Sequence, residues 1–312
     1  MEPSVVLRTT IPLSLLMGLG FFSKKAGFLK HGDERVLSAY IYYFALPALF
    51  IVDLSRIKFT EENVRFIVAG ILPMLISITA FILVYFILHL SKETLYLLTL
   101  STNFGSTVFF GIPFIAFAFP VEGETLAALS ASMIGVVGVT ASITALELHR
   151  MSCAPITDGV KATLRRLSRN PLILSILTGL ILSLANITIP DIIAIPLHML
   201  GSTTVTVAVF MLGVFLHGRK YADTSRAFKL SLTRIILLPF LTVILSPIFN
   251  LTGIQRAVLV VMNGSPLAVS MMVLSERYGF YEDTIASLIL IESIGAGIYL
   301  NLWLILLSLL GA

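Results

Sequence analysis

The chain has 312 residues, of which 57% are hydrophobic and only 12% are charged. A soluble domain carries about 25% charged residues, so this composition excludes an ordinary soluble protein and predicts a polytopic membrane protein. The net charge of +4 comes from basic residues gathered in a few loops, and we do not expect a nucleic-acid partner. The single cysteine, Cys153, excludes an intrachain disulfide and suggests no cysteine-based metal site.

A helix that crosses a bilayer needs roughly 20 mainly apolar residues. Ten segments meet this requirement and predict an all-α membrane protein with ten transmembrane helices. In chain order they are about 5–23, 35–54, 64–90, 95–119, 124–149, 171–188, 192–217, 230–250, 255–278 and 284–310. The longest polar gap divides them five to five. We therefore expect a first unit in residues 1–150, a cytoplasmic linker in 151–170 and a second unit in 171–312.

The positions of the basic residues predict the topology. Sixteen of the 21 Lys and Arg residues, Arg234 among them, are assigned to the loops after helices one, three, five, seven and nine. By the positive-inside rule these loops face the cytoplasm, and both termini lie on the outer side of the plasma (cell inner) membrane. The lysines of the first segment follow its apolar run, so we expect a retained helix rather than a cleaved signal. Because five is odd, the second five-helix unit is inverted relative to the first.

Two predicted helices are interrupted by residues that a plain membrane anchor does not need. Proline removes a backbone donor and glycine lowers helix propensity, so the freed backbone groups need partners from protein, water or ligand. The interruptions contain Asn103, Gly105, Ser106, Thr107, Gly111 and Pro113 in the fourth helix, and Asn263, Gly264, Ser265 and Pro266 in the ninth. Such breaks in corresponding positions of two halves indicate the binding site of an inverted-repeat secondary transporter.

The register between the two halves stays open. Pro113 and Pro266 are 153 residues apart, whereas Gly105-Ser106 and Gly264-Ser265 are offset by 159. Both offsets are close to half of the chain. Either is compatible with two five-helix repeats.

The ten residues of the two interruptions are the predicted substrate-binding residues. No Lys or Arg lies between Thr94 and Leu148, so we expect an anion at the fourth helix to be held by half-helix dipoles and neutral donors. The structural alternative is that these polar side chains only bond neighbouring helices, as buried Ser, Thr and Asn often do in membranes.

Glu292, in the tenth predicted helix, is the candidate for coupling transport to an ion. A carboxylate at the bilayer centre costs at least ~2.5 kcal/mol unless it faces a cavity, pairs or is protonated. Proton or Na⁺ coupling would explain its presence, and so would a protonated carboxyl that bonds a neighbouring helix. We expect no other cofactor and no metal centre.

Several short motifs occur in a fixed order along the chain. They are Ala45-Leu46-Pro47-Ala48-Leu49, Gly111-Ile112-Pro113, Arg169-Asn170-Pro171-Leu172-Ile173, Leu212-Gly213, Ser265-Pro266-Leu267-Ala268 and Glu276-Arg277-Tyr278-Gly279. In this the sequence resembles the auxin efflux carrier family, which belongs with the bile-acid sodium symporters. The resemblance implies two inverted five-helix repeats in which helices four and nine are broken and cross. It also implies an elevator-like movement against a scaffold of helices one, two, six and seven.

The function that follows is a secondary active transporter of a small organic anion, such as a mono- or dicarboxylate or an auxin-like compound. One alternative is a sodium-coupled carrier of the bile-acid symporter type, and a remote one is an intramembrane hydrolase built on Ser106 or Ser265. No Walker-type phosphate loop is present, so ATP is not the direct driver. The expected partners are the anion and the lipid bilayer. We expect no enzymatic activity. Both a monomer and a homodimer are compatible with the sequence.

Overall fold

The computed structural model describes residues 3–30, 32–57, 60–120, 123–150, 168–218, 221 and 223–310. Within these ranges every regular element is a helix, and the β-type pairing consists of one isolated bridge. Six helices of the described part are long and apolar enough to cross a membrane. They are Asp33–Ser55, Glu61–Leu88, Thr125–Arg150, Asp191–Leu216, Thr224–Phe249 and Glu282–Leu309. The all-helical membrane class predicted from composition is thus confirmed.

The elements follow one another as a series of long and interrupted helices. The first half has α1 (Pro3–Lys25), α2 (Asp33–Tyr40), η1 (Ile41–Ala45), α3 (Leu46–Ser55), α4 (Glu61–Leu88), α5 (Lys92–Asn103), η2 (Thr107–Gly111), α6 (Ile112–Ala118) and α7 (Gly123–Arg150). The second half has α9 (Pro171–Leu184), α10 (Asp191–Leu216), α11 (Thr224–Leu232), η3 (Thr233–Leu237), α12 (Leu238–Leu245), η4 (Ser246–Phe249), α13 (Gly253–Gly264), α14 (Ser270–Tyr278) and α15 (Glu282–Leu309).

Each of the ten predicted ranges contains helix, and most ends agree within a few residues. The eighth range was wrong at its start, because α11 begins at Thr224 rather than at 230. Arg226 and Lys229, which the topology prediction placed in a loop, lie inside α11. Most of the predicted linker, residues 151–167, lies outside the described residues.

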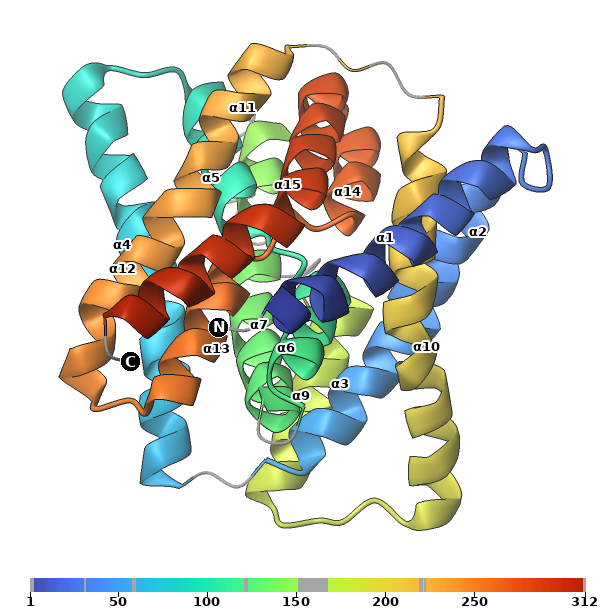
Figure 1. Cartoon of the computed structure of the whole chain (residues 1–312), viewed down its shortest axis with the longest axis vertical. Helices are drawn as coiled ribbons and strands as arrows, with labels where there is room; N and C mark the ends of the chain where they lie inside the picture. Colours follow the sequence, from blue (N-terminus) through green and yellow to red (C-terminus); the bar gives the residue numbers. More distant parts are fainter. Residues whose placement is uncertain are drawn as a thin grey trace.

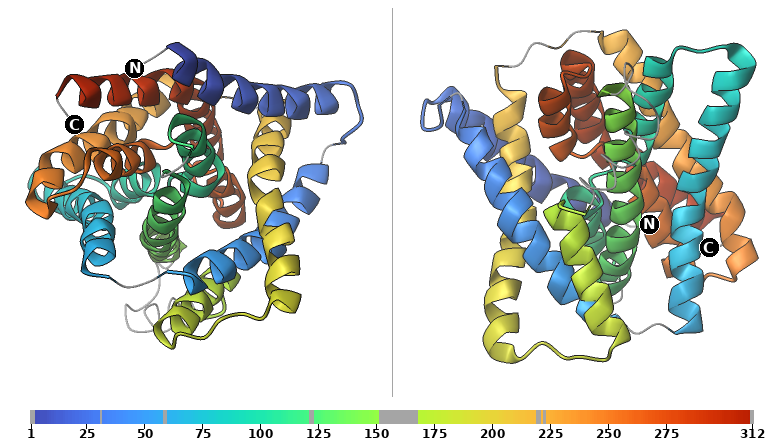
Figure 2. Two further views of the ribbon diagram at one scale, coloured as in Figure 1. Left: turned by 60° about the horizontal axis from the view of Figure 1, so that its bottom comes forward. Right: turned by 180° about the vertical axis from the view of Figure 1, so that it is seen from behind.

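The helices pack as two groups. In one, α1 lies along α10, and α3 contacts both α9 and α10. In the other, α5 packs between α4 and α7, α13 contacts α12 and α7, and α11 contacts α15. Figure 1 shows α1, α2 and α10 on the side opposite α4, α11 and α12, with α6 and α7 between them, and the views of Figure 2 show the same separation.

The connections alternate between two ends of the molecule. The facing ends of α1 and α2, of α4 and α5 and of α10 and α11 lie at the upper end of Figure 1, whereas those of α3 and α4 and of α9 and α10 lie at its lower end. This alternation is what successive membrane crossings require.

Three prolines explain three irregular turns inside the helices. The five-residue π-helical segments η1, η2 and η3 each precede a helix that has proline as its second residue, at Pro47, Pro113 and Pro239. Proline lacks an N–H, and its ring displaces the carbonyl four residues earlier. For Pro239 that carbonyl belongs to Ile235, and it accepts a hydrogen bond of 2.9 Å from Nε1 of Trp303. A side chain of α15 thus satisfies the group that the proline frees, as the apolar surroundings require.

Candidate functional site

Two interrupted helices meet at their breaks. α5 ends at Asn103 and η2 begins at Thr107, while α13 ends at Gly264 and α14 begins at Ser270. The segments between them pair antiparallel, with a bridge between Gly105 and Leu267. The backbone N–H of Ser106 donates to the carbonyl of Pro266 at 2.6 Å. The N–H of Ala268 likewise donates to the carbonyl of Phe104 at 2.9 Å. The two broken segments therefore come together, as their sequence pattern predicts, and each satisfies backbone groups that the other leaves open.

Glycines permit this close approach. A Cβ atom added to Gly105 would overlap Nη2 of Arg234, and one added to Gly111 would lie 2.6 Å from Sδ of Met262. A Cβ on Gly264 would lie 2.9 Å from Cγ of Pro239. At all three positions a larger residue would displace a neighbouring side chain, so these glycines serve contacts between helices rather than a left-handed backbone.

The two asparagines of the predicted site are fully buried and bonded to neighbouring helices. Oδ1 of Asn103 accepts from Oγ of Ser77 at 3.0 Å. Nδ2 of Asn263 donates to the carbonyl of Gly70 and to Oγ1 of Thr242, both at 3.1 Å. These bonds tie the breaks to α4 and α12. The amide donor of Asn263 is thus used inside the protein, while its Oδ1 has no hydrogen-bond partner in the part of the chain that the structure describes.

The remaining predicted residues build the backbone of the breaks. The carbonyl of Ser106 accepts from the N–H groups of Phe110 and Gly111 and so starts η2, whose first residue, Thr107, is buried. Oγ of Ser265 donates to the carbonyl of Met262 at 2.8 Å, so this hydroxyl is bonded to backbone rather than to a base that would activate it. Pro113 lies in the first turn of α6, and Pro266 supplies the paired carbonyl described above.

Arg234 is the residue that the sequence interpretation missed. Its assignment to a cytoplasmic loop is wrong, because it lies in η3 with only 1% of its surface exposed. Its Nε donates to the carbonyl of Ser265, its Nη1 to the carbonyl of Thr102, and its Nη2 to Oγ of Ser265 at 3.4 Å. A buried cation therefore lies beside the break of the fourth helix, while the expectation that dipoles and neutral donors hold an anion there stays a prediction. The signal was present, since Arg234 lies inside the predicted apolar range 230–250.

Glu292 also reaches the breaks. It is fully buried in α15, and its Oε2 accepts a hydrogen bond of 2.7 Å from the backbone N–H of Leu267. Among the described residues its Oε1 has no hydrogen-bond partner. The carboxylate and the guanidinium of Arg234 interact electrostatically. The acid proposed for coupling thus lies at the point where the two broken segments pair.

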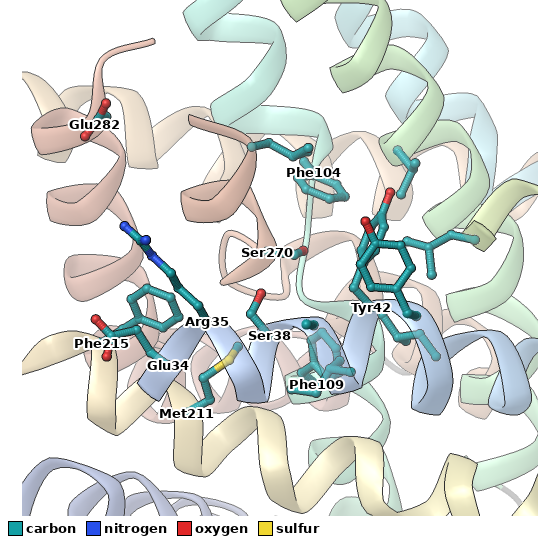
Figure 3. A pocket seen from close by; sticks show the side chains of 17 residues that line it. Glu34, Arg35, Ser38, Tyr42, Phe104, Phe109, Met211, Phe215, Ser270 and Glu282 are labelled. Carbon is teal, nitrogen blue, oxygen red and sulfur yellow. The ribbon is translucent and has the colours of Figure 1, made fainter. Parts of the chain in front are cut away.

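A cavity of about 460 Å³ lies beside this meeting point, between α2, η1 and α10 on one side and the breaks on the other. Figure 3 shows Ser38 of α2 and Ser270, the first residue of α14, both turned toward this space. Phe104 from the first break and Phe109 from η2 form part of its wall. None of the ten predicted substrate-binding residues lines the cavity, whereas Phe104, between Asn103 and Gly105, does. The ten residues thus lie beside the cavity rather than on its wall, and their role in substrate binding stays a prediction.

The lining combines aromatic surface with a few polar groups. Arg35 and Glu34 of α2 reach it, and Glu34 forms an ion pair of 3.3 Å with Lys24. The N-terminus of α14 adds partial positive charge through the helix dipole, while the N–H groups of Met271 and Met272 donate to the carbonyls of Ala268 and Val269. Among the described residues no cluster of His, Cys, Asp or Glu has the arrangement of a metal site. The aromatic residues can therefore contact the apolar part of a ligand, and the positive end of the α14 dipole can stabilise a negatively charged group.

Comparison with known proteins identifies the family of the chain. The sequence profile of a family of membrane transport proteins matches residues 5–304. A protein of Methanocaldococcus jannaschii described as an uncharacterized transporter is 26% identical over 297 residues, which are 93% of this chain and 94% of the relative. The chain is therefore a multi-pass membrane protein that belongs to the family of membrane transport proteins, the auxin efflux carrier family that its motifs resemble.

Proposed function

We propose that the protein is a secondary active carrier of a small organic anion, such as a mono- or dicarboxylate or an auxin-like compound. The observation that supports this most strongly is the cavity of about 460 Å³ with the N-terminus of α14 at its wall. Its volume falls in the range of about 300–1,000 Å³ that is usual for small-molecule sites.

The charges around the cavity favour an anion. The dipole of α14 places its positive end at Ser270, where a carboxylate can accept hydrogen bonds and is stabilised by the dipole. Arg35 adds a full positive charge, and the charge of Glu34 is offset by Lys24. Glu282, the second carboxylate of the lining, is exposed at the start of α15 and is screened by solvent.

The aromatic wall favours an anion with an apolar body. Phe104, Phe109 and Tyr42 present ring surface to the same space as Ser270. A carboxylate bound at the helix end would place its hydrocarbon part against these rings, which removes apolar surface from water.

We further propose that transport is an elevator-type movement and that the ten crossings form two inverted five-helix repeats. The cavity lies between the group of α1, α3, α9 and α10 and the group that carries the breaks, which is where a sliding core would expose a ligand alternately to each side. The alternating connections support ten crossings. The basic loops then face the cytoplasm, and both termini lie outside the plasma membrane.

The test measures thermal unfolding of the detergent-solubilised protein against a panel of small carboxylates. A ligand that binds only the folded protein adds ~2.7 kcal/mol of stability at a hundred times its Kd. Ser270→Asp should remain folded, because Asp is favoured at helix starts, but it should lose the stabilisation since its charge repels the anion. The matched neutral variant Ser270→Asn should keep it. Equal stabilisation of both variants would refute a carboxylate site at the start of α14.

A further inference from the structure

The guanidinium of Arg234 lies where the carbonyl ends of two helices converge. Thr102 is one of the last residues of α5, and Ser265 directly follows α13. Carbonyls at helix C-termini have no intrahelical partner and carry the negative end of the dipole. Arg234 is buried, and its guanidinium donates to the carbonyls of Thr102 and Ser265 and to Oγ of Ser265. Three oxygen atoms from two breaks thus surround one cation.

A buried carboxyl group lies beside this site. Glu292 bonds the N–H of Leu267, two residues after Ser265, and its charge interacts with that of Arg234. Without the guanidinium, a carboxylate and two helix C-termini would face one another in the protein interior. Such an arrangement is costly unless a positive charge balances it.

Oxygen atoms of this kind are the usual ligands of a hard metal cation. Unwound backbone carbonyls and the C-terminal ends of half-helices coordinate Na⁺ in transporters with broken helices. Here the same type of oxygens bind a side chain of the protein itself. Gly105 provides the room, because a Cβ atom at that position would overlap Nη2 of Arg234.

We propose that Arg234 is a tethered cation: its guanidinium takes the position of a monovalent metal ion between the carbonyls of Thr102 and Ser265. The two breaks are then joined without bound Na⁺, and the loss of the guanidinium creates a site for a monovalent cation. The proposal concerns the protein's own charge balance and does not depend on which anion is carried.

The experiment compares thermal unfolding of the full-length protein in NaCl, KCl and choline chloride at equal ionic strength. Wild type and Arg234→Lys, which keeps the charge, should unfold at the same temperature in all three salts. Arg234→Ala should unfold at a lower temperature in choline chloride and should recover saturably with NaCl or with millimolar guanidinium chloride. Arg65→Ala, which removes an exposed arginine of α4, should show no ion-specific response.

Two results with single proteins would overturn the proposal, and a third comes from a double variant. One is an Arg234→Ala variant that is folded but responds to none of the small cations. The other is a wild-type protein that Na⁺ stabilises selectively over choline, because the site would then not be filled by the guanidinium. The comparison of the wild-type protein in NaCl and choline chloride needs no variant, so it tests the proposal even if Arg234→Ala does not fold. The double variant Arg234→Ala with Glu292→Gln should lose the Na⁺ response, and an unchanged response there would equally contradict the role given to the buried charges.

Discussion

Gly105→Ala should destabilise the protein strongly although it adds only one methyl group. The added Cβ would overlap Nη2 of Arg234, and the guanidinium can move away only by giving up its bonds to Ser265 and Thr102. Breaking the interactions of a buried charge costs about 3–5 kcal/mol. At ~2 °C per kcal/mol, the low end of the range for large domains, the unfolding temperature should fall by roughly 6–10 °C.

The assay is the fraction of detergent-solubilised protein that stays monodisperse after heating, measured by size-exclusion chromatography. Gly135→Ala is the matched control, because nothing lies within 4 Å of a Cβ atom built on this glycine of α7. Alanine in a helix interior is favoured over glycine by roughly 0.5–1 kcal/mol, so the control should be unchanged or slightly more stable. Equal stability of the two variants would refute the close packing of Arg234 against the break.

Three other variants test the contacts that hold the breaks. Asn263→Ala should lower the free energy of unfolding by about 1–3 kcal/mol, since it leaves buried acceptors unpaired, and an unchanged denaturation midpoint would contradict the two bonds of its amide. Trp303→Phe should cost ~1–3 kcal/mol alone but clearly less in a Pro239→Ala background, where a restored N–H can bond the carbonyl of Ile235; equal losses would rule out that pairing. Glu292→Gln should stay folded, because its amide oxygen can still accept a hydrogen bond, and should remove the pH dependence of transport into proteoliposomes if the carboxyl couples protons. An unaltered pH profile would leave Glu292 with a purely structural role.

The sequence predicted the helical segments and the two interrupted ones well, for local reasons. Long apolar runs specify membrane helices, and Gly and Pro in both interruptions specify breaks. Gly105 and Pro266 therefore marked the two segments that pair in the structure. The alternative that buried polar side chains only bond neighbouring helices describes both asparagines well. The amide of Asn103 bonds groups of α4 and α5, and that of Asn263 bonds groups of α4 and α12.

The cavity could not be derived from local patterns. Its wall combines α2, η1 and α10 with residues next to the breaks, and only the tertiary packing brings these segments together. Ser270 gave no signal because a serine in an apolar segment is compatible with a helix interior as well as with a helix start.

The positive-inside rule led to the wrong assignment of Arg234 to a cytoplasmic loop. The positive-inside rule counts charges near the ends of helices, and Arg234 follows Arg226 and Lys229, which lie in the first turns of the same segment. A single arginine deeper in an apolar run is instead a candidate functional residue. Its partners are backbone carbonyls far along the chain, at Thr102 and Ser265, and no sequence pattern reveals these.

The most direct test of the central claim is a labelling experiment at the start of α14. In a Cys153→Ser background, Ser270→Cys should react with a small anionic thiol reagent, and the carboxylate that stabilises the wild type should slow this reaction. Ser265→Cys, placed in the fully buried part of the break, should react far more slowly and without protection. If Ser270→Cys is unreactive, or reacts at the same rate with and without the carboxylate, the cavity beside the breaks is not the anion site.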